Sequence, residues 1–180
     1  MAIIVKNPLF LRIDREIHAI LVEMQMLGYA RDYLQTPDMR VTADASRLYP
    51  IIVAGTASTI EKVYSGMERC LKMLAQDIDG YVPSGDSWHR DLLVQVAHPV
   101  PGIRDIPIIS EDTLQALTVL KDFRHRERNL YGSDLVVDRV IDLAGKAQNG
   151  LEKLNRDLEI FGRRIGAIVE KSPPSSGPCM

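Results

Sequence analysis

A short run of the sequence concentrates side chains that bind anions. Residues 123–132 have the sequence Phe-Arg-His-Arg-Glu-Arg-Asn-Leu-Tyr-Gly, with three arginines, a histidine, an amide and a tyrosine. Arg124 and Arg128 are four residues apart, and residues at this spacing are neighbours on one side of a helix. Paired guanidinium groups can hold a phosphate through several hydrogen bonds at once. The run therefore predicts a site for a phosphate-bearing ligand.

Further polar side chains extend this candidate site. His125 and Asn129 form a second pair at the same spacing, and Tyr131 follows seven residues after Arg124, almost in line with it. The alternative is a solvated helix face, in which Glu127 offsets the arginines and cations are favoured near a helix C-terminus. The mixture of guanidinium, imidazole, amide and phenol groups favours a binding site.

The composition is that of an ordinary globular domain. The chain has 180 residues, 46% of them hydrophobic and 26% charged, with a formal net charge of -2. Binding to nucleic acid must therefore come from a local basic patch, which counts against a nonspecific DNA-coating protein. We expect one domain over residues 1–171, followed by a disordered tail over residues 172–180 that is rich in proline and serine.

Several kinds of site are not expected. The four histidines are far apart in the sequence and lack the short spacings of a zinc site, and no glycine-rich phosphate loop occurs. Cys70 and Cys179 suit neither a disulfide framework nor a metal cluster, which favours a reducing, cytoplasmic setting. No signal peptide or membrane-spanning segment is apparent. We therefore expect no metal, no cofactor and no membrane partner.

Helical patterns joined by connections that contain proline and glycine cover the chain. They predict an all-α antiparallel bundle of about four to five helices. Gly80 is expected to end the second helix in a left-handed conformation, and the proline-rich loop over residues 99–109 is expected to be extended. The predicted helices cover residues 10–34, 51–79, a short segment capped by Asp86 or Ser87 that ends before Pro99, a segment capped by Ser110 that ends at Tyr131, and 134–169.

Two other groups of residues have two interpretations each. Glu68 and Arg69 could be buried polar partners of the basic run, but Glu68 and Lys72 also have the spacing of an ordinary surface pair, which we prefer. Trp88 and His89 could line a pocket, but a single tryptophan in a small bundle is more often part of the core, and we prefer that role.

The basic run resembles the signature of a known superfamily. The spacing is similar to the HEPN signature, in which four to six residues separate an arginine from a histidine. In this chain four residues separate Arg124 from Asn129, and one residue separates Asn129 from Tyr131. In the HepT toxin branch a tyrosine follows that histidine at the same offset as Tyr131. Residues 84–93 and 100–104 also resemble this HepT-like ribonuclease-toxin group, and the resemblance covers residues 50–169.

The resemblance implies a helical domain that forms a homodimer, with the two motifs facing each other across a cleft. It implies a metal-independent endoribonuclease in which the arginine and histidine act while the 2′-hydroxyl of RNA attacks the adjacent phosphate. Arg124 and Asn129 then hold the catalytic positions, and His125, Arg128 and Tyr131 contact RNA. A minimal nucleotidyltransferase antitoxin modifies the motif tyrosine in this group, and Tyr131 has that position.

Asn129 departs from the family pattern, because an amide cannot transfer a proton near neutral pH. Three outcomes are open: His125 supplies the imidazole, Asn129 orients RNA in an enzyme that relies on its arginines, or the protein binds RNA, a nucleotide or a partner without cutting. On a regular helix Asn129 is also about 140° around the axis from Arg124, since five residues turn about 100° each.

Overall fold

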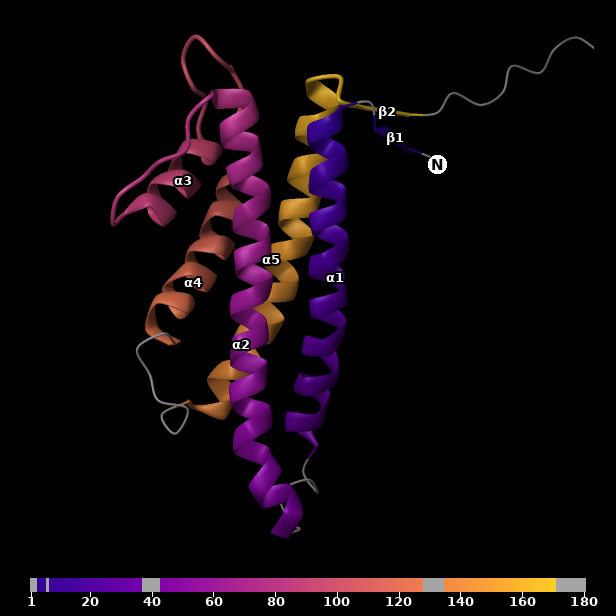
Figure 1. Cartoon of the computed structure of the whole chain (residues 1–180), viewed down its shortest axis with the longest axis vertical. Coiled ribbons are helices and arrows are strands. Elements are labelled where there is room, and N and C mark those ends of the chain that lie inside the picture. The colour runs from indigo at the N-terminus through magenta and orange to yellow at the C-terminus, as the bar shows by residue number, and fades with distance from the viewer. Residues whose placement is uncertain (1–2, 6, 37–42, 128–134, 171–180) are drawn as a thin grey trace, which may run out of the picture.

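The computed structural model describes the backbone of residues 3–5, 7–36, 43–127 and 135–170, and the side chains of residues 7–36, 47–124 and 135–169. Five α-helices make up most of the described chain, so the predicted all-α bundle is confirmed (Figure 1). The elements are β1 (Ile3–Val5), α1 (Pro8–Gln35), α2 (Ala43–Leu74), the π-helix η2 (Ala75–Asp79), α3 (Trp88–Ala97), α4 (Glu111–Glu127), α5 (Val137–Arg164) and β2 (Ile168–Glu170).

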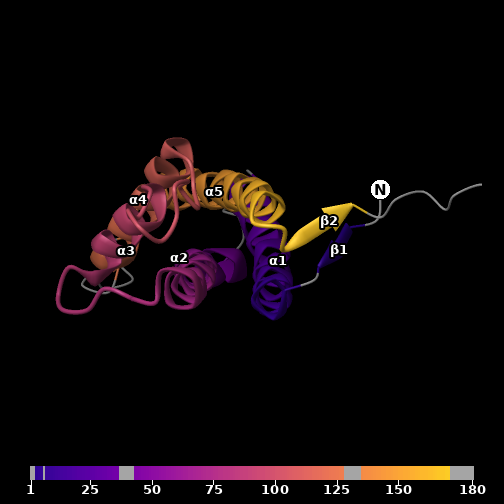
Figure 2. The ribbon, with the colours of Figure 1, turned by 90° about the horizontal axis from the view of Figure 1, so that it is seen from above.

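The three longest helices lie side by side along the long axis of the molecule. α1 and α2 run antiparallel and pack closely, and α5 packs on both (Figure 1). The view from above places α3 and α4 on the side of the bundle opposite the strands (Figure 2). None of the described helices is both long and apolar enough to cross a membrane. The largest fully buried side chains are Leu27, Leu34, Ile60, Tyr64, Met67, Leu71, Leu74, Leu92, Leu93, Ile108, Ile109 and Phe161.

The second helix begins earlier than the sequence predicts. It was expected to start after Pro50, but α2 begins at Ala43 and contains Pro50. A proline removes one backbone donor, and Pro50 is on the solvent-exposed side of the helix, where water can replace that bond. The other end follows the prediction, because Gly80 has a φ of 72° and its N–H donates to the carbonyl of Ala75.

The loop between α3 and α4 is folded tightly, so the predicted extended loop is wrong. Gly102 has a φ of 79° and allows a turn that pairs Val100 with Arg104. The buried guanidinium of Arg104 donates to the carbonyls of Gln95, His98 and Ile106 and to the carboxylate of Asp79. These bonds fasten the loop to α3 and to η2, and so fix the positions of α3 and α4.

The α4 helix starts as the sequence predicts. The Ser110 hydroxyl accepts from the N–H of Thr113, and both hydroxyls donate to Asp157 of α5. The helix is described as far as Glu127. Its predicted continuation to Tyr131 and the predicted tail over residues 172–180 lie outside the described residues.

The last helix is shorter than predicted at both described ends. It was expected over residues 134–169, but α5 ends at Arg164, and Gly166 with a φ of 72° reverses the chain. The following strand β2 pairs antiparallel with β1, with Ile4 opposite Val169. Three residues are too few to show a clear alternating pattern, so this small sheet was not expected.

Candidate functional site

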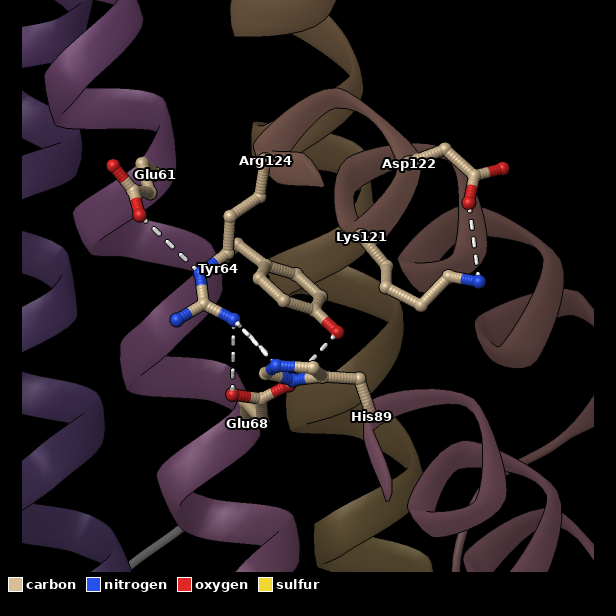
Figure 3. Close-up of polar contacts among 7 residues, drawn as sticks. All are labelled: Glu61, Tyr64, Glu68, His89, Lys121, Asp122 and Arg124. Carbon is tan, nitrogen blue, oxygen red and sulfur yellow. Dashed lines mark hydrogen bonds and ion pairs between the residues drawn. The ribbon is translucent and has the colours of Figure 1, made fainter. Parts of the chain in front are cut away.

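The first arginine of the basic run points into the protein. Arg124 is in the last described turn of α4, and its side chain is only 14% exposed. Its guanidinium lies against α2 and α3, where Nε donates to Glu61 Oε1 at 3.3 Å and Nη1 is 3.7 Å from Glu68 Oε2 (Figure 3). A solvated helix face therefore does not describe Arg124.

Glu68 is the centre of this cluster. Its side chain is 6% exposed, and its carboxylate contacts the imidazole of His89 and accepts from the phenol of Tyr64 at 3.2 Å. Our preferred interpretation of Glu68 as half of a surface pair with Lys72 is therefore wrong, and the buried-partner interpretation is confirmed for Glu68. It is wrong for Arg69, which is exposed and bonds Glu16.

The phenol of Tyr64 is a fixed donor in the cluster. Burial raises the pKa of Tyr64 far above its ordinary value, and the charge of Glu68 raises it further. Tyr64 therefore stays protonated and donates its hydrogen bond to Glu68 throughout the neutral range. One lone pair of that carboxylate is thereby held in place.

Trp88 and His89 begin α3 and lie against each other. Trp88 is partly buried against the core, which agrees with our preferred interpretation, but its ring is also 3.5 Å from that of His89, centroid to centroid. The ammonium group of Lys72 lies 3.5 Å from the centroid of the Trp88 ring, a cation–π contact. The tryptophan thus helps to hold His89 over α2.

The contacts of His89 favour one tautomer of its imidazole. Arg124 Nη1 is 3.1 Å from His89 Nε2 and 3.3 Å from Nδ1, and a guanidinium can only donate. A carboxylate accepts from the Nδ1–H tautomer of the imidazole, and in that tautomer Nε2 is the ring nitrogen that can accept from Arg124. In this tautomer the unprotonated ring nitrogen lies 3.1 Å from the guanidinium nitrogen, and an imidazole and a guanidinium at this distance can act together on a proton and a phosphate.

The described part of the cluster does not carry excess positive charge. Glu61 and Glu68 together offset the single charge of Arg124, and the nearby Lys121 is paired with Asp122 at 3.1 Å. The local attraction for an anion that the sequence predicts is therefore not supplied by these residues. Any such attraction would have to come from residues outside the described part of the chain.

Comparison with known families identifies the family of the chain. The family model described as HepT-like protein matches residues 55–165, which is more than half of the chain and includes every residue of the cluster. The chain belongs to the HepT-like family. No curated protein and no solved structure matched the chain.

The HepT-like motif is only partly within the described residues. Arg124 is described, and His125 belongs to α4 although its side chain lies outside the described part. Arg128, Asn129 and Tyr131 also lie outside it. The convergence of Asn129 with Arg124 therefore stays a prediction.

Three residues of the polar cluster around Arg124 were not assigned to a site from the sequence. Glu61, Tyr64 and Glu68 are spaced by three and four residues on α2, so they share the helix face that meets α4. Polar groups at these positions in an otherwise apolar stripe are a signal that could have indicated a buried polar site. His89 comes from a different helix, and the sequence indicated it as a residue that could line a pocket without indicating its contact with Arg124.

Proposed function

We propose that this HepT-like protein is the toxin component of a toxin–antitoxin pair and cleaves RNA without a metal ion. The observation that carries the proposal is the enclosure of the motif arginine, Arg124, in a polar cluster where it donates to an imidazole. An arginine serving only solubility would not need the buried carboxylate of Glu68 and the partly buried one of Glu61 to orient it. Oriented guanidinium groups stabilise the charge that develops on a phosphate during cleavage.

The reaction we propose is internal transesterification of RNA. The 2′-hydroxyl attacks the adjacent phosphorus, the bond to the 5′-oxygen breaks, and the products carry a 2′,3′-cyclic phosphate and a 5′-hydroxyl. Arg124 Nη2 makes no hydrogen bond to a described residue, so its two N–H groups can serve a phosphate oxygen. Arg128, His125 and Tyr131 contact the RNA strand in this proposal, and Asn129 orients it.

The same proposal includes a homodimer and a partner. A minimal nucleotidyltransferase would block the site by attaching a nucleotide to Tyr131. The added phosphate would place negative charge beside Arg124 and Arg128, which neutralises the surface that RNA requires.

The test is cleavage of total RNA in the presence of EDTA by the wild-type protein and by Arg124→Ala. Arg163→Ala is the matched control, because Arg163 is a half-exposed surface arginine at the end of α5 that pairs with Glu159. We expect the wild type and the control to cut RNA with cyclic phosphate ends, and Arg124→Ala to lose at least 100-fold in rate, about the effect of removing one charge-stabilising donor. An inert wild type, or an equally active Arg124→Ala, would refute the ribonuclease proposal.

A second candidate is a module that binds RNA, a nucleotide or a protein partner without cutting. Two features favour it: Glu61 and Glu68 offset the charge of Arg124, and Asn129 replaces the motif histidine. It predicts that the wild type binds RNA or partner but does not cut, and that Asn129→His gains cleavage.

A further inference from the structure

We infer that His89, held by Glu68, is the proton-transferring residue of this protein. It takes the role of the motif histidine, whose position in this chain is occupied by Asn129. The inference rests on the proposed ribonuclease function and assigns to a residue of α3 the proton transfer that the amide of Asn129 cannot perform. First, two of the other histidines do not contact Arg124. His18 is exposed on α1, and His98 Nδ1 is bonded to the carbonyl of Val94. Among the histidines with described side chains, His89 is the one in contact with Arg124.

The second step is orientation. A catalytic imidazole works when a third group fixes its tautomer and direction. Glu68 does this for His89 by accepting from Nδ1–H, and Glu68 is itself held by Tyr64. Nε2 is then the basic nitrogen, and it faces Arg124 (Figure 3).

The third step is access. The side chain of His89 is 27% exposed, compared with 6% for Glu68, so the imidazole lies at the solvent edge of the cluster while its carboxylate partner lies beneath it. A ligand can therefore reach the ring of His89 without displacing Glu68. Binding would replace the hydrogen bond from Arg124 to Nε2, and Nη1 could then donate to the phosphate.

The chemical step is a transesterification between neighbouring groups of the RNA. Nε2 of His89 takes the proton of the 2′-hydroxyl while its oxygen forms the bond to phosphorus. The bond between phosphorus and the 5′-oxygen breaks, and that oxygen takes a proton from water. The resulting hydroxide is neutralised when the imidazolium releases its proton, so no other reactant is consumed. Arg124 stabilises the charge on the phosphate oxygens during the exchange.

The experiment measures single-turnover cleavage of RNA in EDTA by the wild type, His89→Ala, His89→Gln and Arg124→Ala. His98→Gln is the matched control, because His98 is an exposed histidine at the other end of α3. We expect a loss of about 10²–10⁴-fold in both His89 variants, the usual contribution of a general base. Free imidazole should restore part of the rate to His89→Ala, whereas it should not affect Arg124→Ala. His89→Gln keeps a donor for Glu68 and tests the inference if His89→Ala does not fold.

The outcomes separate this inference from the proposed function. If the wild type cuts, Arg124→Ala does not, and the folded His89 variants cut normally, then His89 is not the base and the ribonuclease proposal survives. Loss of activity in His89→Ala without rescue by imidazole, together with normal activity in His89→Gln, would show a structural role and also overturn the inference. A wild type that does not cut overturns both.

Discussion

We expect the buried ion pair between Arg104 and Asp79 to contribute strongly to the stability of the protein. Arg104 Nε donates to Asp79 Oδ1 at 2.7 Å and Nη2 donates to Oδ2 at 3.2 Å, and the two side chains are only 5% and 2% exposed. Arg104 also donates to three backbone carbonyls. Arg104→Met would leave a buried carboxylate whose remaining described partner is the amide of Gln95, at 2.8 Å.

We expect Arg104→Met to lower the free energy of unfolding by about 3–5 kcal/mol, the usual cost of removing one partner from a buried pair. For a chain of this length each kcal/mol lowers the melting temperature by roughly 2–4 °C, so a fall of about 10 °C is expected. The free energy of unfolding of Arg104→Lys should lie between those of the wild type and Arg104→Met, because an ammonium group has three donors and cannot make all five bonds of Arg104.

The assay is urea unfolding followed by circular dichroism, with Arg90→Met as the matched control. Arg90 is 69% exposed and pairs with its neighbour Asp91, so its loss should change the stability by less than about 0.5 kcal/mol. The double variant Asp79→Asn with Arg104→Met should be more stable than the sum of the single effects predicts. A cost below about 1 kcal/mol for Arg104→Met, or strict additivity, would refute the argument that this pair fastens the loop.

Two further predictions test packing and burial away from the site. Gly162→Ala should destabilise the protein by about 1–3 kcal/mol, because a Cβ there would lie 2.7 Å from the ring of Phe10, whereas Gly28→Ala meets nothing within 4 Å and should gain up to about 1 kcal/mol; thermal unfolding of both variants measures the difference, and equal effects would contradict it. In a Cys179→Ser background, the Cys70 thiol should react with a disulfide reagent at pH 8 far more slowly in the native state than in guanidinium, because burial raises the pKa of Cys70 to about 12. Since the unfolded thiol ionises first, this group should also lower the free energy of unfolding as the pH rises above its ordinary value of about 8.5; fast native labelling would refute the burial.

The helices could be predicted wherever an apolar stripe marks the buried face. The positions of α1 and α4 follow from such stripes and, in α4, from the cap at Ser110. The start of α2 was missed because Pro50 is a strong local signal for a helix start, although α2 in fact begins at Ala43. The loop around Arg104 was missed because its carboxylate partner, Asp79, is 25 residues away in sequence.

The sequence could indicate residues of the candidate site only where they are close together along the chain. Arg124 belongs to a compact motif, so its residue type and spacing identified it. Glu61 and His89 reach it from 63 and 35 residues earlier in the chain. Their convergence depends on how α2, α3 and α4 pack, and spacing along one helix carries no information about that packing. Glu68 was assigned to the surface for the same reason, since its pair spacing with Lys72 was visible and its burial was not.

In the proposed mechanism Arg124 and His89 act as one unit on RNA, and a kinetic double-variant cycle measures this coupling. Single-turnover cleavage rates in EDTA would be measured for the wild type, Arg124→Ala, His89→Gln and the double variant. Residues that act together are strongly non-additive. We expect the double variant to cut about as slowly as the slower single variant. If the two losses multiply, or if the wild type does not cut RNA, the claim is contradicted.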